Sequence, residues 1–70
     1  MELTAVLTPA EEGGFVALNP ATGTTTQEDT VEEAVANLKE ATASYLSEFP
    51  LPSIGHPVVT MFTVPAPVHA

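Results

Sequence analysis

The clearest pattern in the chain is a helical repeat of apolar and small side chains between residues 29 and 49. They recur at intervals of three and four residues, which places them on one face of an α-helix, with polar residues on the opposite face. The repeat consists of Val31, Ala34, Val35, Leu38, Ala41, Thr42, Tyr45, Leu46 and Phe49. Because such a helix gains most of its stability from packing, the rest of the chain must supply a surface that covers this face.

Both ends of this helix carry sequence signals. Thr30 and Glu33 have the spacing of a capping box, in which the Thr30 hydroxyl accepts from the Glu33 N–H and the Glu33 carboxylate accepts from the Thr30 N–H. Asp29, Glu32 and Glu33 also place negative charge at the positive end of the helix dipole. Pro50 ends the helix, because a proline disfavours the α conformation at the residue before it.

Shorter runs before the helix have the character of β-strands. Residues 3–8 alternate as a strand should, residues 15–18 (FVAL) form an apolar run, and residues 24–27 are short, polar and β-branched. Turn residues separate these runs at 9–14 and 19–23, where proline and glycine are frequent. The pattern predicts an antiparallel meander of three strands.

After the helix, residues 50–57 are predicted to be a proline-rich connector, and residues 58–64 (VVTMFTV) a fourth strand. The predicted fold is α+β, β-β-β-α-β, with a four-stranded mixed sheet in the order 3-2-1-4 and the helix packed on one face. We expect one domain over residues 1–64 and a flexible tail over residues 65–70.

The face of this sheet that the helix leaves open is expected to be apolar. Either Phe15 with Ala17 or Val16 with Leu18 must point outward, and the predicted fourth strand carries no charge. An apolar open face beside an uncharged edge favours pairing with another chain, so we expect a homo-oligomer. The predicted oligomer edge consists of Val58, Val59, Met61, Phe62 and Val64.

The composition narrows the class of protein. Seventy residues make one small domain, and 44% hydrophobic residues is ordinary for a globular one. The absence of cysteine excludes disulfides, thiolate nucleophiles and cysteine-based zinc sites, so a reducing cytoplasm is the expected location. No secretory signal is recognisable, and the longest apolar run has four residues, which is too short to span a bilayer.

The charge balance is strongly acidic, with nine carboxylates, one basic residue (Lys39) and a formal net charge of −8. Such a surface repels nucleic-acid phosphates and anionic membranes, so neither is an expected direct partner. A basic protein surface is the natural electrostatic partner. The alternative is that the charge only keeps the protein soluble.

Carboxylates offer two candidate sites, and each has a simpler explanation. Glu11 and Glu12 could form a catalytic pair, but adjacent residues in a turn rarely converge on one substrate, and a solvated turn explains them. Asp29, Glu32 and Glu33 could bind a divalent cation, but helix capping and the helix dipole already account for them.

Histidine and glycine signals are weaker still. His56 and His69 lie in proline-rich segments without the spacing of a zinc site. Gly13 and Gly14 are too short a pair to cradle a phosphate and suit a hairpin turn. The serines have no pattern of an activating base. The sequence therefore predicts no catalytic residue, cofactor or metal site, and we do not expect an enzyme.

Two stretches, EEGGFVALNP from residue 11 and TQEDTVEEAVANLKEA from residue 26, resemble the HicB-type antitoxin family. The family pattern is an acidic turn with Gly-Gly-aromatic, a strand, a proline turn with glycine, and a helix opened by Asp-Thr-x-Glu-Glu-Ala. The matching positions are Glu11, Glu12, Gly13, Gly14, Phe15, Ala17, Pro20, Gly23, Thr26, Asp29, Thr30, Glu32, Glu33, Ala34, Asn37, Glu40 and Ala41.

This resemblance implies a partial RNase H-like fold without nuclease activity and a role as antitoxin in a type II toxin–antitoxin system. The partner would be a small basic HicA-type toxin that cleaves mRNA, and the antitoxin would mask its active site. The chain departs from the pattern in lacking a cysteine after the second strand. It is also expected to be a short form without a DNA-binding domain, so operator binding is not carried over.

The expected partner-binding residues form an acidic rim. They are Glu11, Glu12, Glu28, Asp29, Glu32 and Glu33. The alternative function is that of a solitary HicB-fold structural or regulatory homo-oligomer with no toxin partner. An adjoining gene for a small basic protein would favour the first interpretation.

Overall fold

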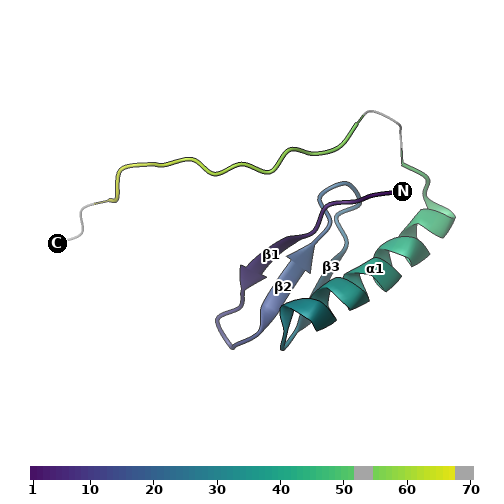
Figure 1. The fold of residues 1–70 in the computed structure, drawn as a ribbon, viewed down its shortest axis with the longest axis horizontal. Coiled ribbons are helices and arrows are strands. Elements are labelled where there is room, and N and C mark those ends of the chain that lie inside the picture. Colours follow the sequence, from purple (N-terminus) through teal and green to yellow (C-terminus); the bar gives the residue numbers. More distant parts are fainter. Residues whose placement is uncertain (52–54, 68–70) are drawn as a thin grey trace.

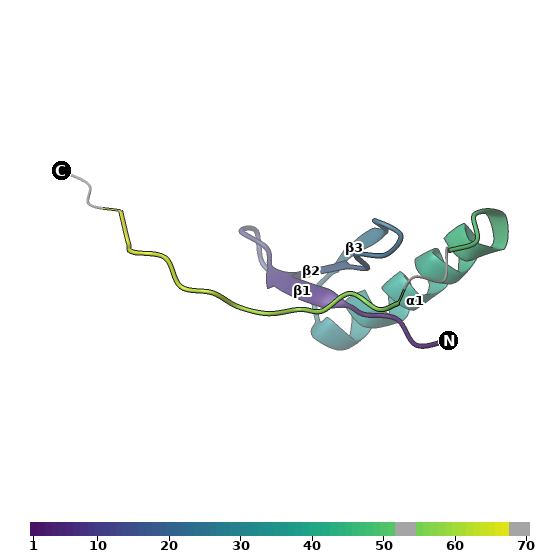
Figure 2. The same cartoon turned by 90° about the horizontal axis from the view of Figure 1, so that it is seen from above.

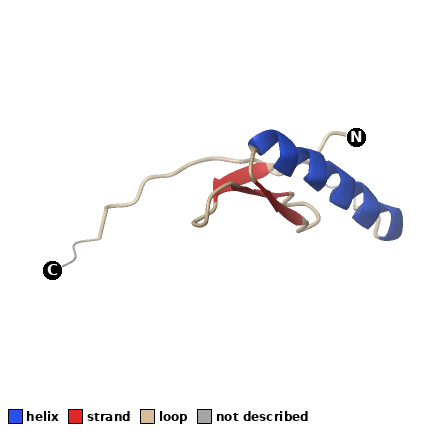
Figure 3. Cartoon of the chain, turned by 90° about the horizontal axis from the view of Figure 1, so that it is seen from below, coloured by secondary structure: helices blue, strands red, loops and turns tan. Residues whose placement is uncertain are grey.

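The computed structural model of the protein describes residues 1–51 and 55–67. Three strands, β1 (Val6–Pro9), β2 (Phe15–Leu18) and β3 (Thr25–Glu28), precede one helix, α1 (Val31–Glu48). The strands form an antiparallel sheet in the order β1-β2-β3. The helix crosses one face of this sheet and contacts β2 and β3 (Figures 1 and 3). The predicted three-stranded meander and the single helix are therefore present.

The predicted fourth strand is wrong. The element order is β-β-β-α instead of β-β-β-α-β, and the sheet has three strands instead of four in the order 3-2-1-4. Residues 55–67 have neither helical nor strand structure, and this segment leads away from the sheet (Figures 1 and 2). A β-branched run favours extended backbone, but it becomes a strand only where an edge pairs with it. Pro57 and Pro65, which bracket the run, lack the N–H that a sheet requires.

The register of the sheet decides which side chains the helix covers. Ala17 on β2 lies opposite Leu7 on β1 and Thr26 on β3, and it is fully buried beneath α1. Because side chains alternate along a strand, Phe15 and Ala17 share the covered face, and Val16 and Leu18 lie on the open face. The open face therefore carries apolar side chains of β2 beside Thr25 and Gln27 of β3, so it is less apolar than expected.

The apolar core is small. Ala17, Ala34 and Leu38 are buried, and Ala5 and Leu7 pack against them while partly exposed. The predicted apolar face of the helix is only partly buried, since the buried row of α1 consists of Ala34, Leu38 and Thr42. Val31 and Val35, one position to the side, remain 38% and 37% exposed, and Phe49 is 57% exposed. The three-stranded sheet is too narrow to cover them.

A buried polar network joins the N-terminal segment to the turn between β2 and β3. The Asn19 side chain, 2% exposed, donates to the Thr4 carbonyl oxygen at 2.9 Å. Its Oδ1 atom accepts from the Thr22 N–H at 3.0 Å and from the Thr22 hydroxyl at 2.7 Å. The Thr24 hydroxyl pairs with that of Thr22 at 2.7 Å and with that of Thr42 on α1 at 2.8 Å. These bonds tie the segment before β1 and the helix to one turn.

The start of α1 follows the predicted cap in part. Thr30 is extended, and its hydroxyl oxygen accepts from the Glu33 N–H at 3.1 Å. The Glu33 carboxylate accepts from the Thr30 hydroxyl at 2.9 Å, whereas we expected it to accept from the Thr30 N–H. The helix closes at Phe49, whose N–H donates to the Tyr45 carbonyl oxygen.

Two strand boundaries differ from those predicted. The strand predicted over residues 3–8 begins at Val6 instead, and the third strand is displaced by one residue. Residues 52–54 and 68–70 lie outside the described residues. The predicted connector (50–57) and tail (65–70) are therefore described only in part, and His69 not at all.

Candidate functional site

The acidic rim predicted from the sequence gathers at one end of the molecule. The β1–β2 turn carries Glu11 and Glu12, and the junction between β3 and α1 carries the other four carboxylates; both lie at the same end (Figure 1). Gly14, at φ +77°, brings the turn against the junction, because a Cβ there would overlap the backbone oxygen of Glu28. Glycine at this position is therefore needed both for its positive φ and for the close approach.

A side-chain hydrogen bond holds the turn to β3. The Gln27 amide donates to the Glu12 carboxylate, with Nε2 and Oε1 2.6 Å apart. This bond, together with a backbone hydrogen bond, holds the pKa of Glu12 below its usual range, because both stabilise the charged form. The fully exposed Glu12 carboxylate is therefore ionised, and its position is fixed relative to the sheet.

The carboxylates of the junction surround the start of the helix. Asp29, Glu32 and Glu33 are exposed, while Glu28 is half-buried beside the turn. Glu32 and Glu33 lie in the first turn of α1, where the helix dipole stabilises negative charge. Glu33 serves the cap, as described above. The chain's one basic residue, Lys39, lies further along α1, so this end of the molecule has a single sign of charge.

The shape of this end suits a contact surface better than a pocket. Its residues belong to two turns and the start of a helix, and most of them are exposed. Within residues 1–51 and 55–67, no three His, Cys, Asp or Glu side chains are placed to hold a metal ion. His56 lies near Leu51 and Met1, away from the acidic end.

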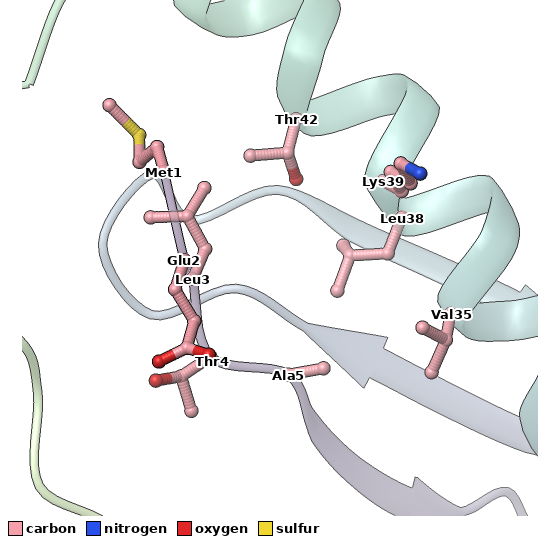
Figure 4. A pocket seen from close by; sticks show the side chains of 9 residues that line it. All are labelled: Met1, Glu2, Leu3, Thr4, Ala5, Val35, Leu38, Lys39 and Thr42. Carbon is pink, nitrogen blue, oxygen red and sulfur yellow. The ribbon is translucent and has the colours of Figure 1, made fainter.

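A second feature, which the sequence analysis did not find, is a groove between the N-terminal segment and α1 (Figure 4). We call it the N-terminal groove. Its helix wall consists of Val35, Leu38, Lys39 and Thr42, and its other wall of residues 1–5. The sequence signal was the row of Val31 and Val35, which lies beside the buried row of the helix.

The third feature is the segment 58–64, which we call the C-terminal arm. It contains the residues predicted as an oligomer edge, and among the described residues after Met1 they are the most exposed large apolar side chains. Their exposed fractions are 89% for Val58, 59% for Val59, 94% for Met61, 85% for Phe62 and 64% for Val64. Complete burial of such a side chain against a partner would contribute about 1.5–3 kcal/mol.

Comparisons with protein-family models, with curated proteins and with solved structures find no match for this chain. The HicB resemblance therefore stays a prediction. In the described part of the chain, none of the helical structure is long and apolar enough to cross a membrane.

Proposed function

We propose that this protein is an antitoxin-like inhibitor that neutralises a small, basic, mRNA-cleaving toxin of the HicA type by masking its active site, in the cytoplasm. The observation that carries the proposal is the acidic end. The close approach at Gly14 and the bond from Gln27 to Glu12 bring carboxylates of two separate segments together on a chain of net charge −8. The HicB resemblance of the same segments supports it.

The proposed mechanism is electrostatic and steric. An enzyme that cleaves mRNA presents basic groups where the phosphate backbone binds. Carboxylates can form charge-assisted hydrogen bonds with those groups and so block the binding of RNA. A surface of one sign also accelerates association with an oppositely charged partner. The turn and the helix start are held by hydrogen bonds, so little ordering is required on binding. The inhibitor itself performs no chemical step in this mechanism.

The test is association with the product of an adjoining gene for a small basic protein. Co-expression should relieve that protein's toxicity. The double variant Glu11→Lys/Glu32→Lys should slow association by about tenfold or more at low salt and flatten its salt dependence. Glu40→Lys/Glu48→Lys, which makes the same change in net charge further along α1, is the matched control and should change the rate much less. Equal rates for both variants, or failure to relieve toxicity, would contradict the proposal.

A second candidate function is that of a solitary structural or regulatory homo-oligomer without a toxin. The observation in its favour is the C-terminal arm, whose large apolar side chains are exposed in the single chain. This function predicts a stable oligomer and no basic protein in a pull-down with the full chain.

A further inference from the structure

The helix lies over β2 and β3, and the side of it that faces the N-terminal segment is only partly covered. β1 is an edge strand that pairs with β2 on one side. Val35 and Leu38 of α1 reach over the space beside the N-terminal segment, where they form the wall of the N-terminal groove (Figure 4). Val31, one turn earlier on the same row as Val35, is also 38% exposed. The partly covered side of the helix, with Val31 and Val35, therefore faces the part of the sheet that ends at the β1 edge.

Residues 3–9, along this edge, carry no charge, and four of the seven are leucine, alanine or valine. Leu3, Ala5 and Leu7 alternate toward the covered face, and Val6 lies on the open face. The bond from Asn19 to the Thr4 carbonyl oxygen holds the segment before β1 in line with the strand. The edge available for pairing therefore begins before β1 and continues to Pro9. It ends there because proline has no N–H to donate to a neighbouring strand.

The C-terminal arm has the properties of the strand that this edge lacks. It carries no charge and is rich in valine and threonine. In an extended segment Val58, Phe62 and Val64 lie on one side, and Val59 and Met61 on the other. All five are well exposed, and the arm leads away from the sheet of its own chain (Figures 1 and 2).

We propose that two copies of this chain exchange their C-terminal arms, each arm pairing along the β1 edge of the other copy and placing Val58, Phe62 and Val64 against Val31 and Val35. The inference deepens the second candidate function, because both rest on the exposed C-terminal arm, and it needs no basic partner. The arm would form main-chain hydrogen bonds with the β1 edge, and its apolar side chains would pack against the helix wall of the groove.

Two observations favour a second copy as the occupant. On a chain of net charge −8, the arm and residues 3–9 of the β1 edge carry no charge, and the two charged residues at the groove, Glu2 and Lys39, have opposite signs. The two surfaces can therefore approach where the acidic ends would repel each other. The arm and the groove also occur together on every chain, so a reciprocal exchange covers both on each copy with two-fold symmetry.

The test combines mass measurement with cross-linking of the full chain. The chain has no cysteine, so introduced cysteines report single positions. Two differently tagged variants, Val35→Cys and Phe62→Cys, are refolded together and treated with a short bismaleimide. Arm exchange predicts a mixed cross-linked dimer of both tags, and twice the 7.3 kDa chain mass for the untreated parent at micromolar concentration. Ser44→Cys, on the helix face opposite Val35, replaces Val35→Cys as the control and should not cross-link to the arm.

Further variants make each outcome decisive. Phe62→Asp should be a monomer where the parent is a dimer, while Ala43→Asp, with the same added charge on the exposed helix face, should stay dimeric. A monomeric parent would overturn the proposal. So would a dimer without the mixed cross-link, or a Val35→Cys/Phe62→Cys double variant that cross-links within one chain. Because these measurements use the chain alone, they are independent of any basic partner, and failure of the toxin assay leaves them unaffected.

Discussion

The body of the molecule (residues 1–51) buries mainly small side chains, whereas the C-terminal arm exposes large apolar ones. The body buries two alanines and one leucine, together with Asn19 and Thr42. The arm exposes valine, methionine and phenylalanine side chains. The body is therefore held by close backbone approach, hydrogen bonds and a little apolar area, whereas the arm holds apolar area that the single chain does not use. The stability of this protein therefore has two contributions. One comes from contacts within the body of a single chain, and the other depends on what covers the C-terminal arm.

The largest expected effect separates these two parts directly. Leu38→Ala truncates the largest apolar side chain that is buried in the described part of the chain, and should lower the free energy of unfolding by about 2–5 kcal/mol. A chain of this length has only about 4–10 kcal/mol in total, so the variant should be close to unfolded at room temperature.

The matched truncation in the arm is Met61→Ala, since Met61 is 94% exposed. At protein concentrations low enough to keep the chain monomeric, urea unfolding should give the parent's midpoint within error. Leu38→Met, which conserves volume, should cost less than about 1.5 kcal/mol. A loss of stability for Met61→Ala in the monomer as large as that for Leu38→Ala would show that the arm contributes within the chain.

The next effect concerns the polar part of the body. Asn19→Ala leaves the Thr4 carbonyl oxygen and the Thr22 N–H without their side-chain partner. Unfolding free energy should fall by about 1–3 kcal/mol, because buried polar groups are then unsatisfied. Asn37→Ala, the same substitution on the exposed face of α1, should stay within about 0.5 kcal/mol of the parent. Equal stability of the two variants in urea would contradict a structural role for the network.

The features that the sequence predicted are those set by neighbouring residues. The helix followed from its period, its Thr30 cap and Pro50, all of which act within a few positions. The hairpins followed from turns whose glycines adopt positive φ. The acidic rim was predicted as a set of residues from charge and family resemblance, and its convergence at one end is a consequence of the antiparallel meander.

The features that the sequence did not predict correctly depend on distant partners. A strand propensity over residues 58–64 is local, but pairing requires an edge that another part of the molecule presents, and the single chain does not bring the two together. Asn19 followed by Pro20 reads as an ordinary turn, and nothing nearby indicates that its amide reaches back to Thr4. The N-terminal groove could be found only after the buried row of the helix was known.

The smallest expected effect tests the acidic end, where the turn is held to the body by one exposed hydrogen bond. Gln27→Ala removes the main cause of the lowered pKa of Glu12, so the pKa measured by NMR titration should rise. A folded-state pKa below the unfolded value contributes stability at neutral pH that is lost as pH falls through the folded-state pKa. The variant should therefore show a slightly weaker loss of stability on acidification than the parent. Thr25→Ala, also exposed on β3, is the matched control and should leave the titration of Glu12 unchanged. An unchanged Glu12 titration in Gln27→Ala would mean that the bond does not form in solution, and that the turn carrying Glu11 and Glu12 is joined to the junction by the approach at Gly14 alone.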